Sequence, residues 1–334
     1  MVALATATRL EPDPVAVLAT ADAKVGALAD LIGDSLEACR AALPLHVVEA
    51  RLATGDLDGI VDAVPWAVAF AQPATLVAKA PPALGDQLTS LIADLITAGA
   101  RLSGVSPEHF ALINAEAVRA AREHGARLVT NVRAATREAI ARIIGRAVRG
   151  RYTVRDAAVL IRNIVGLTLR QANAAAAFAD ALAARAAAGQ SSAGLASRWT
   201  LAGRLPAHPT PQQAADAAAR YAARLLRHRA TVIARTEVLR AANRGLTLAW
   251  EVAARTGDLG WSSQKVWVTT PDDRLCSSCS SLSGANVGLA SDFAPPGGYL
   301  SGKVVAAEPP LHPQCRCTVY LEAVPPPRSA VLVG

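Results

Sequence analysis

The sequence predicts a mainly α-helical protein with a small α+β part at its C-terminal end. Alanine, the strongest helix former, is abundant along the 334 residues, and aromatic residues are scarce. Helix-start patterns precede long runs with apolar side chains at helical spacing. The last part of the chain is rich in loops and holds four of the five cysteines. We therefore expect a helical body with one long helix that leads into a loop-rich β subdomain stapled by metal or by disulfides.

The first region, residues 1–105, is predicted to be an N-terminal helical region. Residues 21–43 and 89–102 carry apolar side chains at helical spacing, with a proline-rich loop between them. Cys39 stands alone in the first of these patterns, which is typical of a small core residue. We find no chemical motif in this region.

The second region, residues 106–257, is predicted to be the helical body. Residues 109–150 keep apolar side chains on roughly one face, and Gly150 is placed to end that helix. Patterns of the capping-box type then predict two shorter helices, which begin after Thr153 and after Thr168.

The strongest helix start lies at Thr210. Pro211 suits the first helical position, and Gln213 completes a capping box. The periodic pattern continues to Gly257, with Gly245 as the candidate position for a bend. We expect one helix at about 211–257, long enough to cross a whole domain.

Residues 258–325 are predicted to form the small β subdomain, and residues 326–334 a tail. Residues 266–268 are β-prone, residues 283–302 have loop composition, and residues 315–324 are typical of a closing strand. The subdomain is too short and too loop-rich to be stable through burial alone, so it needs a staple.

Five side chains are candidate ligands for that staple. Cys276 and Cys279 have the spacing at which two thiolates converge on one ion, and His312 and Cys315 repeat it with an imidazole. In a strand, Cys317 would point to the same face as Cys315. Because a tetrahedral zinc takes four ligands, one candidate is left out, and the spacing leaves open whether it is His312, Cys315 or Cys317.

A structural zinc is the preferred interpretation, because clustered cysteines in a reducing compartment bind metal more often than they pair. Disulfide pairs in a particle that leaves the cell are the alternative. Four protein ligands also favour structure over catalysis, since catalytic zinc keeps a position for water.

Four charged residues near these motifs are candidates for supporting roles. Arg235 and Glu237 are too close along a helix to pair with each other, and we expect them to anchor the stapled subdomain. Asp272 and Asp273 follow a proline turn, where they are expected to cap the turn or accept hydrogen bonds from metal ligands. We predict no catalytic residue among them.

The chain carries a formal charge of +7, and arginines crowd the region between residues 119 and 170. Such a region can contact DNA phosphates without sequence preference, dock an acidic protein, or form a solvated helical face. The candidate contacts are five arginines of the predicted helix: Arg133, Arg137, Arg142, Arg146 and Arg149.

Targeting and nucleotide-binding signals are not found. The apolar start is interrupted by Glu11, Asp13 and Pro14, and no stretch is long enough to span a bilayer, so we expect a soluble intracellular product without membrane contact. The sequence also holds no Walker loop, dinucleotide fingerprint or nucleophile elbow.

The order of the motifs resembles the phage Mu protein F-like head morphogenesis family, the minor head or minor capsid proteins of tailed phages and prophages. The likeness covers about residues 230–320. Its first element is Arg235-Thr236-Glu237 on the long helix. The second comprises Trp267, Thr269, Thr270, Asp272, Asp273, Arg274, Cys276 and Cys279. The third comprises Pro309, Pro310, His312, Pro313, Cys315, Arg316 and Cys317.

The resemblance implies a non-enzymatic, low-copy component of the virion head, built into the procapsid in the host cytoplasm at the portal vertex. Its implied partners are the portal protein, capsid or scaffold proteins, and in some members DNA. Two other hypotheses stay open. One is a metal-dependent nuclease or hydrolase that uses Asp272, Asp273 and His312 around an open zinc. The other is a non-specific nucleic-acid-binding protein.

Overall fold

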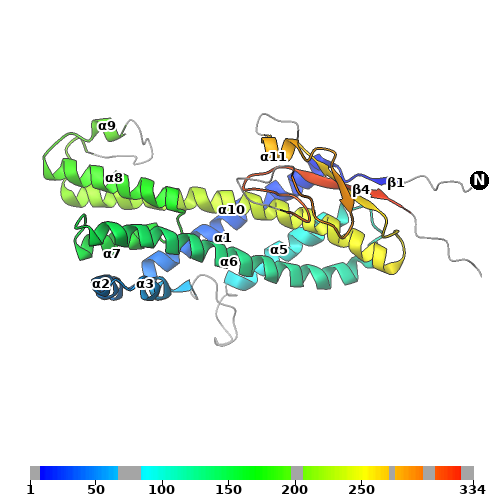
Figure 1. Ribbon diagram of the computed structural model, residues 1–334, viewed down its shortest axis with the longest axis horizontal. Coiled ribbons are helices and arrows are strands. Elements are labelled where there is room, and N and C mark those ends of the chain that lie inside the picture. Colours follow the sequence, from blue (N-terminus) through cyan, green and yellow to red (C-terminus); the bar gives the residue numbers. More distant parts are fainter. Residues whose placement is uncertain (1–7, 67–83, 197–205, 271–274, 296–304, 325–334) are drawn as a thin grey trace, which may run out of the picture. The chain divides into compact units, whose positions relative to one another are not determined.

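The computed structural model describes residues 8–66, 84–196, 206–270, 275–295 and 305–324. Most of these residues are helical, and a small antiparallel sheet includes strands near the C-terminal end (Figure 1). The predicted fold class, mainly α with a small α+β part, is therefore confirmed. None of the described helices has a stretch both long and apolar enough to span a bilayer.

The chain divides into two compact units, each assembled from separate segments. The first unit comprises Met1–Ala29, Gln87–His124 and Val232–Gly334, and the second comprises Asp30–Asp86 and Gly125–Thr231. The boundaries predicted near residues 105 and 257 follow the order of the chain instead, and they stay a prediction.

Three long helices contribute residues to both units: α1 Pro14–Ala42, α6 Phe110–Val148 and α10 Pro211–Thr256. The predicted start of α10 is confirmed, because Gln213 N–H donates to Thr210 Oγ1 at 3.3 Å and Thr210 N–H donates to Gln213 Oε1 at 2.9 Å. Its end is confirmed as well, since the next residue, Gly257, has a φ of 90°.

The second unit contains the shorter helices α2 Leu45–Thr54, α3 Leu57–Ala63, α7 Val154–Ile164, α8 Leu169–Ala187 and α9 Ala193–Ala196. Both predicted helix starts in this unit are observed. Thr153 accepts a hydrogen bond from Asp156 N–H, and Thr168 forms a full capping box with Gln171.

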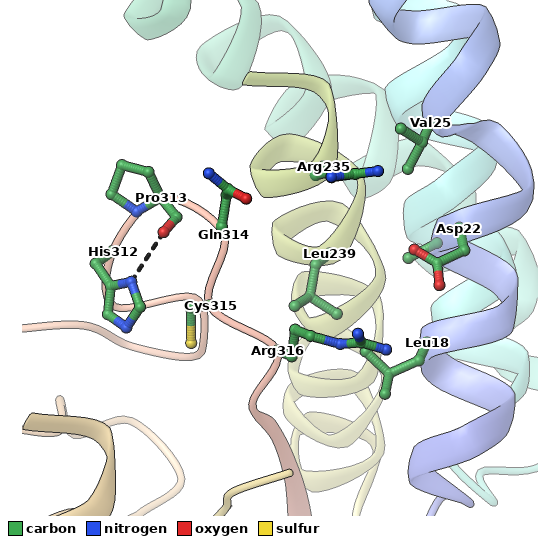
Figure 2. Close-up of a pocket in the computed structure, with 11 residues that line it drawn as sticks. Leu18, Asp22, Val25, Arg235, Leu239, His312, Pro313, Gln314, Cys315 and Arg316 are labelled. Atoms are coloured by element: carbon green, nitrogen blue, oxygen red, sulfur yellow. Dashed lines mark hydrogen bonds between the residues drawn. The ribbon is translucent and has the colours of Figure 1, made fainter. Parts of the chain in front are cut away.

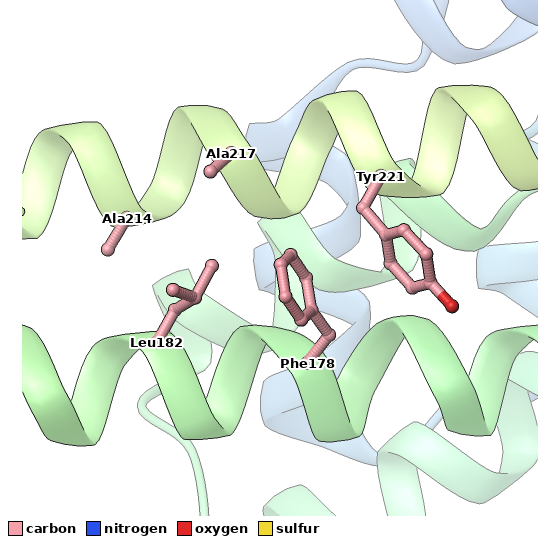
Figure 3. Close-up of a cluster of buried hydrophobic side chains, with 5 residues drawn as sticks. All are labelled: Phe178, Leu182, Ala214, Ala217 and Tyr221. Carbon is pink, nitrogen blue, oxygen red and sulfur yellow. The ribbon is translucent and has the colours of Figure 1, made fainter. Parts of the chain in front are cut away.

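Part of the core of the second unit lies between α8 and α10. Figure 3 shows Phe178 and Leu182 of α8 facing Ala214, Ala217 and Tyr221 of α10, and all five are buried. The rings of Phe178 and Tyr221 are tilted by 55°, with their centroids 4.8 Å apart. The alanines leave room for these rings, which explains how a sequence poor in aromatic residues fills this core.

The first unit is organised around a close helix pair, α10 and α5 Leu84–Arg101. A Cβ on Gly99 would collide with the Ala242 carbonyl, and one on Gly245 would collide with the Ile96 carbonyl. Glycine is therefore required on both helices where their backbones approach. Helix α10 continues through Gly245 without a break, so this glycine allows the close approach of α5 and does not interrupt the helix.

The sheet of the first unit consists of β1 Thr8–Leu10, β4 Thr318–Ala323, β2 Gln264–Val268 and β3 Asn286–Gly288, in that spatial order. All neighbouring strands are antiparallel. In the sequence analysis only the two strands β2 and β4 were expected. The strands β1 and β3 fall in regions predicted as helix and loop, because three residues are too few to show an alternating pattern.

Two short helical turns complete this unit. The 3₁₀ turn η1 Pro107–His109 precedes α6, and α11 Ser277–Ser280 follows β2. The indole N–H of Trp250, which is fully buried on α10, donates to the Ser103 carbonyl at 3.0 Å and joins α10 to the segment after α5.

Candidate metal centre

The local structure of α11 brings the first two candidate ligands together. Cys276 is the N-cap residue of α11, and its sulfur accepts a hydrogen bond from the Cys279 backbone N–H at 3.3 Å. Cys279 is buried and Cys276 is half-buried. The spacing of three residues therefore places both sulfurs at one side of this turn.

His312 presents one ring nitrogen to these sulfurs. Its Nε2 lies 3.2 Å from Cys276 Sγ and 3.1 Å from Cys279 Sγ. Its Nδ1 lies 2.9 Å from the Pro313 carbonyl oxygen, which can only accept a hydrogen bond. The proton of a neutral His312 therefore resides on Nδ1, and the Nε2 lone pair is directed at the two cysteines, as in a ligating histidine.

The two remaining cysteines, Cys315 and Cys317, also lie close to Cys279. Cys279 Sγ and Cys315 Sγ are 3.7 Å apart. Two thiolates on a tetrahedral zinc, with Zn–S bonds of about 2.3 Å, are separated by about 3.8 Å. A disulfide requires about 2.05 Å, and all five cysteines of the chain are free thiols here. The separation of these two sulfurs thus suits a shared ion.

A cavity of about 20 Å³ lies among the candidates, and all five of them line it: Cys276, Cys279, His312, Cys315 and Cys317. This volume is close to that of a single water or ion. The ligand atoms form two overlapping groups that share Cys279, and within each group they lie within 4.8 Å of one another. The geometry of the cluster could therefore hold a metal ion.

The three buried thiols of the cluster are not equivalent. Hydrogen bonds from Cys279 and Cys317 lower the pKa of Cys315 to about 2. The hydrogen bond to Cys315 raises the pKa of Cys279 far above its usual range. For Cys317, a hydrogen bond with Cys279 lowers the pKa, but contact with Cys315 and burial raise it to about 12. Cys315 is thus the most acidic of the three thiols, and a bound cation would favour deprotonation of the other two.

Two polar residues of α10 hold the ligand-bearing segment: Thr236, which the sequence analysis named only as part of the family motif, and Asn243, which it missed. Thr236 Oγ1 accepts a hydrogen bond from Gln314 N–H at 3.1 Å. Asn243 is fully buried, and its Nδ2 donates to the Cys317 carbonyl at 3.2 Å. The sequence signal that could have identified them is a polar side chain on the apolar face of the predicted long helix, because a buried polar group needs a hydrogen-bond partner.

The charged residues that were expected to support the site lie in different surroundings. Glu237 forms an ion pair with Arg240, one turn further along α10. Arg235 and Arg316 are exposed and line a pocket beside the cluster. Asp272 and Asp273 lie outside the described residues.

A buried charge network lies under the segment that leads to His312. Glu308 accepts a hydrogen bond from Thr247 Oγ1 at 3.1 Å and lies 3.9 Å from Arg244. The ammonium group of Lys265, almost fully buried, donates to the Ala307 carbonyl at 2.8 Å. Burial raises the pKa of Glu308, against the opposing effects of Arg244 and Lys265.

In the second unit, two of the arginines proposed for DNA contact are already paired. Arg133 forms an ion pair with Asp62, and Arg137 forms one with Asp58 of α3. Their charges are therefore partly neutralised within the unit.

The other three candidate arginines are less engaged: Arg142 and Arg146 of α6, and Arg149 directly after its last residue. Arg146 Nη2 donates to Asn173 Oδ1 at 3.2 Å, a neutral partner. Arg142 and Arg149 are exposed and make no ion pair within the described parts of the chain. The predicted basic face thus reduces to these two free guanidinium groups and Arg146.

Comparison with known proteins identifies one family. Residues 211–320 match the family model described as phage Mu protein F like protein. The matched segment begins at the first residue of α10, ends in β4 and includes all five candidate ligands. No curated protein and no solved structure matches the chain.

Proposed function

We propose that the chain, whose residues 211–320 match the phage Mu protein F-like family, is a structural minor head protein of a tailed phage or prophage. The family points to phage head morphogenesis. In the finer proposal the chain acts in procapsid assembly at the portal vertex. Its partners are the portal protein and capsid or scaffold proteins, and it is built into the virion head in the host cytoplasm. The observation that carries the proposal is the family match across the whole stretch from α10 to β4.

The structural part of the proposal is a zinc held by Cys276, Cys279, His312 and Cys315. The Nε2 atom of His312 faces two of the sulfurs, and the separation of Cys279 and Cys315 is that of a thiolate pair on one zinc. Cys317 then lies beside the ion, buried next to Cys279 and Cys315. In this proposal the zinc stabilises a small β subdomain and takes part in no reaction.

The zinc couples that subdomain to α10. Two of its ligands lie in the segment that Thr236 and Asn243 hold against the helix, so closing the shell also fixes this segment. A small rigid surface on a long helix is suited to docking on other head proteins. Four protein ligands leave no position for a reactive water, which favours this assembly role over the hydrolase alternative.

A second function, non-specific contact with DNA, is supported by one observation at the C-terminal end of α6. Arg142 lies near the end of the helix, Arg149 directly follows its last residue, Val148, and both arginines are exposed. Such groups bind phosphates by displacing counterions, without reading the sequence.

The assembly role is tested by following the chain through head purification. Heads and procapsids are isolated from a producing host and the chain is quantified by mass spectrometry, next to the portal protein. We expect it in both particles at low copy number, and fewer or misassembled heads when its gene is deleted. Normal heads without the chain would contradict the proposal.

A further inference from the structure

A pocket of about 540 Å³ opens beside the metal cluster in the first unit. Its walls are α1, α10 and the segment 312–316 (Figure 2). Leu18 and Val25 supply apolar surface above the buried Leu239, and Asp22, Arg235 and Arg316 supply charge. The pocket thus combines an apolar wall with a few charged groups, as ligand sites do.

The two arginines of this pocket are its distinctive feature. Figure 2 shows the side chains of Arg235, from α10, and Arg316, from the segment after the cluster, extending toward α1. Both are exposed, and neither guanidinium group has an ion pair or hydrogen bond with any residue that the structure describes. Planar guanidinium groups without a partner fit carboxylates in a two-point geometry.

The pocket depends on the same segment as the metal cluster. His312 and Cys315 are proposed ligands, and Gln314 and Arg316 alternate with them along the chain. Gln314 has a φ of 63°, an uncommon conformation for a residue with a side chain, and its N–H is held by Thr236. Closing the metal shell therefore fixes the position of Arg316 in the pocket wall.

We propose that this pocket binds a short acidic segment of a partner protein, with acidic side chains on Arg235 and on Arg316 and a neighbouring apolar side chain on Leu18 and Val25. The carboxylate of Asp22 favours a protein ligand over a nucleic acid. A continuous line of phosphates would face this carboxylate, whereas a peptide can offer it an amide or a cation. The proposal deepens the assembly role, because it gives the chemistry by which another head protein is recognised.

The test uses the full-length zinc-loaded protein and a random heptapeptide library. Peptides selected on the wild-type protein are expected to carry Asp or Glu next to an apolar residue, and to lose affinity when the acid is changed to its amide. Arg235→Gln and Arg316→Gln are each expected to weaken their binding about 10-fold. Arg224→Gln, an exposed arginine of the same helix outside the pocket, is the matched control and leaves binding unchanged.

The outcomes separate this proposal from the assembly role. Because both pocket arginines are exposed, the variants are expected to keep the thermal midpoint of the wild type. No selected peptide, peptides that bind without an acid, or equal binding by all three variants would overturn the acidic-segment site. Displacement of the peptides by a short DNA duplex, lost in Arg235→Gln, would overturn it in favour of nucleic acid. The head-purification experiment decides the assembly role independently.

Discussion

Asn243 and Thr318 are joined by a buried hydrogen bond in which Thr318 Oγ1 donates to Asn243 Oδ1 at 2.7 Å. The amide nitrogen of the same asparagine donates to the Cys317 carbonyl. One side chain in the middle of α10 thus ties down the end of the cysteine segment and the first residue of β4. The link between the long helix and the stapled subdomain is polar and specific, in addition to the surrounding apolar packing.

Replacing Asn243 with alanine is expected to destabilise the protein by about 3 kcal/mol, because the Thr318 hydroxyl and the Cys317 carbonyl would be buried without a partner. Urea denaturation measures this change in the free energy of unfolding. Asn131→Ala, an exposed position of α6, is the control and should change it by less than about 0.5 kcal/mol. Equal effects of both variants would mean that the buried link carries no special stability.

Gly245→Ala is expected to lower stability although alanine is the better helix former by about 1 kcal/mol. The added methyl group would meet the Ile96 carbonyl of α5, and such overpacking costs about 1–3 kcal/mol. Gly26→Ala on α1 adds the same methyl where nothing lies within 4 Å, so it should raise stability. Thermal unfolding of the two variants therefore gives shifts of opposite sign. A rise in both midpoints would disprove the close approach.

Glu308→Gln is expected to change the pH dependence of stability. Because burial raises the pKa of Glu308 above its ordinary value of 4.5, the folded state binds a proton more tightly than the unfolded state. The wild type should therefore lose stability relative to the variant as the pH rises from about 4.5. Urea titrations of both proteins between about pH 4 and 7 measure this difference, in which the shared titration of the metal ligands cancels. A wild type that gains relative stability over this range would show that Arg244 and Lys265 outweigh burial.

The double variant Arg142→Gln/Arg149→Gln is expected to weaken DNA binding and to reduce its salt dependence. Loss of two phosphate contacts lowers the slope of log K against log salt concentration by roughly 2. Fluorescence anisotropy with a duplex of random sequence provides the measurement. Arg133→Gln/Arg137→Gln removes the same charge from arginines paired with Asp62 and Asp58 and should leave the slope nearly unchanged. No binding by the wild type at low salt would rule out the DNA function.

Much of the fold could be predicted from the sequence because local sequence patterns mark where several helices begin and end. Thr153, Thr168 and Thr210 each begin a helix as their local patterns predict, and Gly150 and Gly257 follow the ends of two long helices with positive φ. These signals lie within a few residues of the boundary they define. The fold class and the resemblance to the phage Mu protein F-like family followed from them and from the spaced cysteine motif.

The remaining features depend on contacts between distant segments. The pairing of β1 with β4 joins residues 8–10 to residues 321–323. The N-terminal strand is too short to show a strand pattern in the sequence, so this pairing could not be predicted. Thr236 and Asn243 gain their roles only when the C-terminal segment lies on α10. The ion pairs of Arg133 with Asp62 and of Arg137 with Asp58 likewise form only because α3 lies beside α6. Spacing identified the candidate ligands, but the separations of their sulfur and nitrogen atoms required the structure.

The ligand set proposed for the zinc makes a distinct prediction for the two last cysteines. Cys276→Ser and Cys315→Ser each remove a ligand and should abolish stoichiometric metal, whereas Cys317→Ser should retain it. Circular dichroism reports whether the β subdomain stays folded in each variant. Retention by Cys315→Ser with loss by Cys317→Ser would exchange the roles of these two residues.

The metal content of the purified full-length protein, determined by elemental analysis together with a count of free thiols, is the most direct test of the stapled subdomain. We predict about one zinc per chain, with no disulfide, and loss of that zinc in Cys276→Ser. A protein without metal, whose clustered cysteines are oxidised in pairs, would contradict the zinc centre.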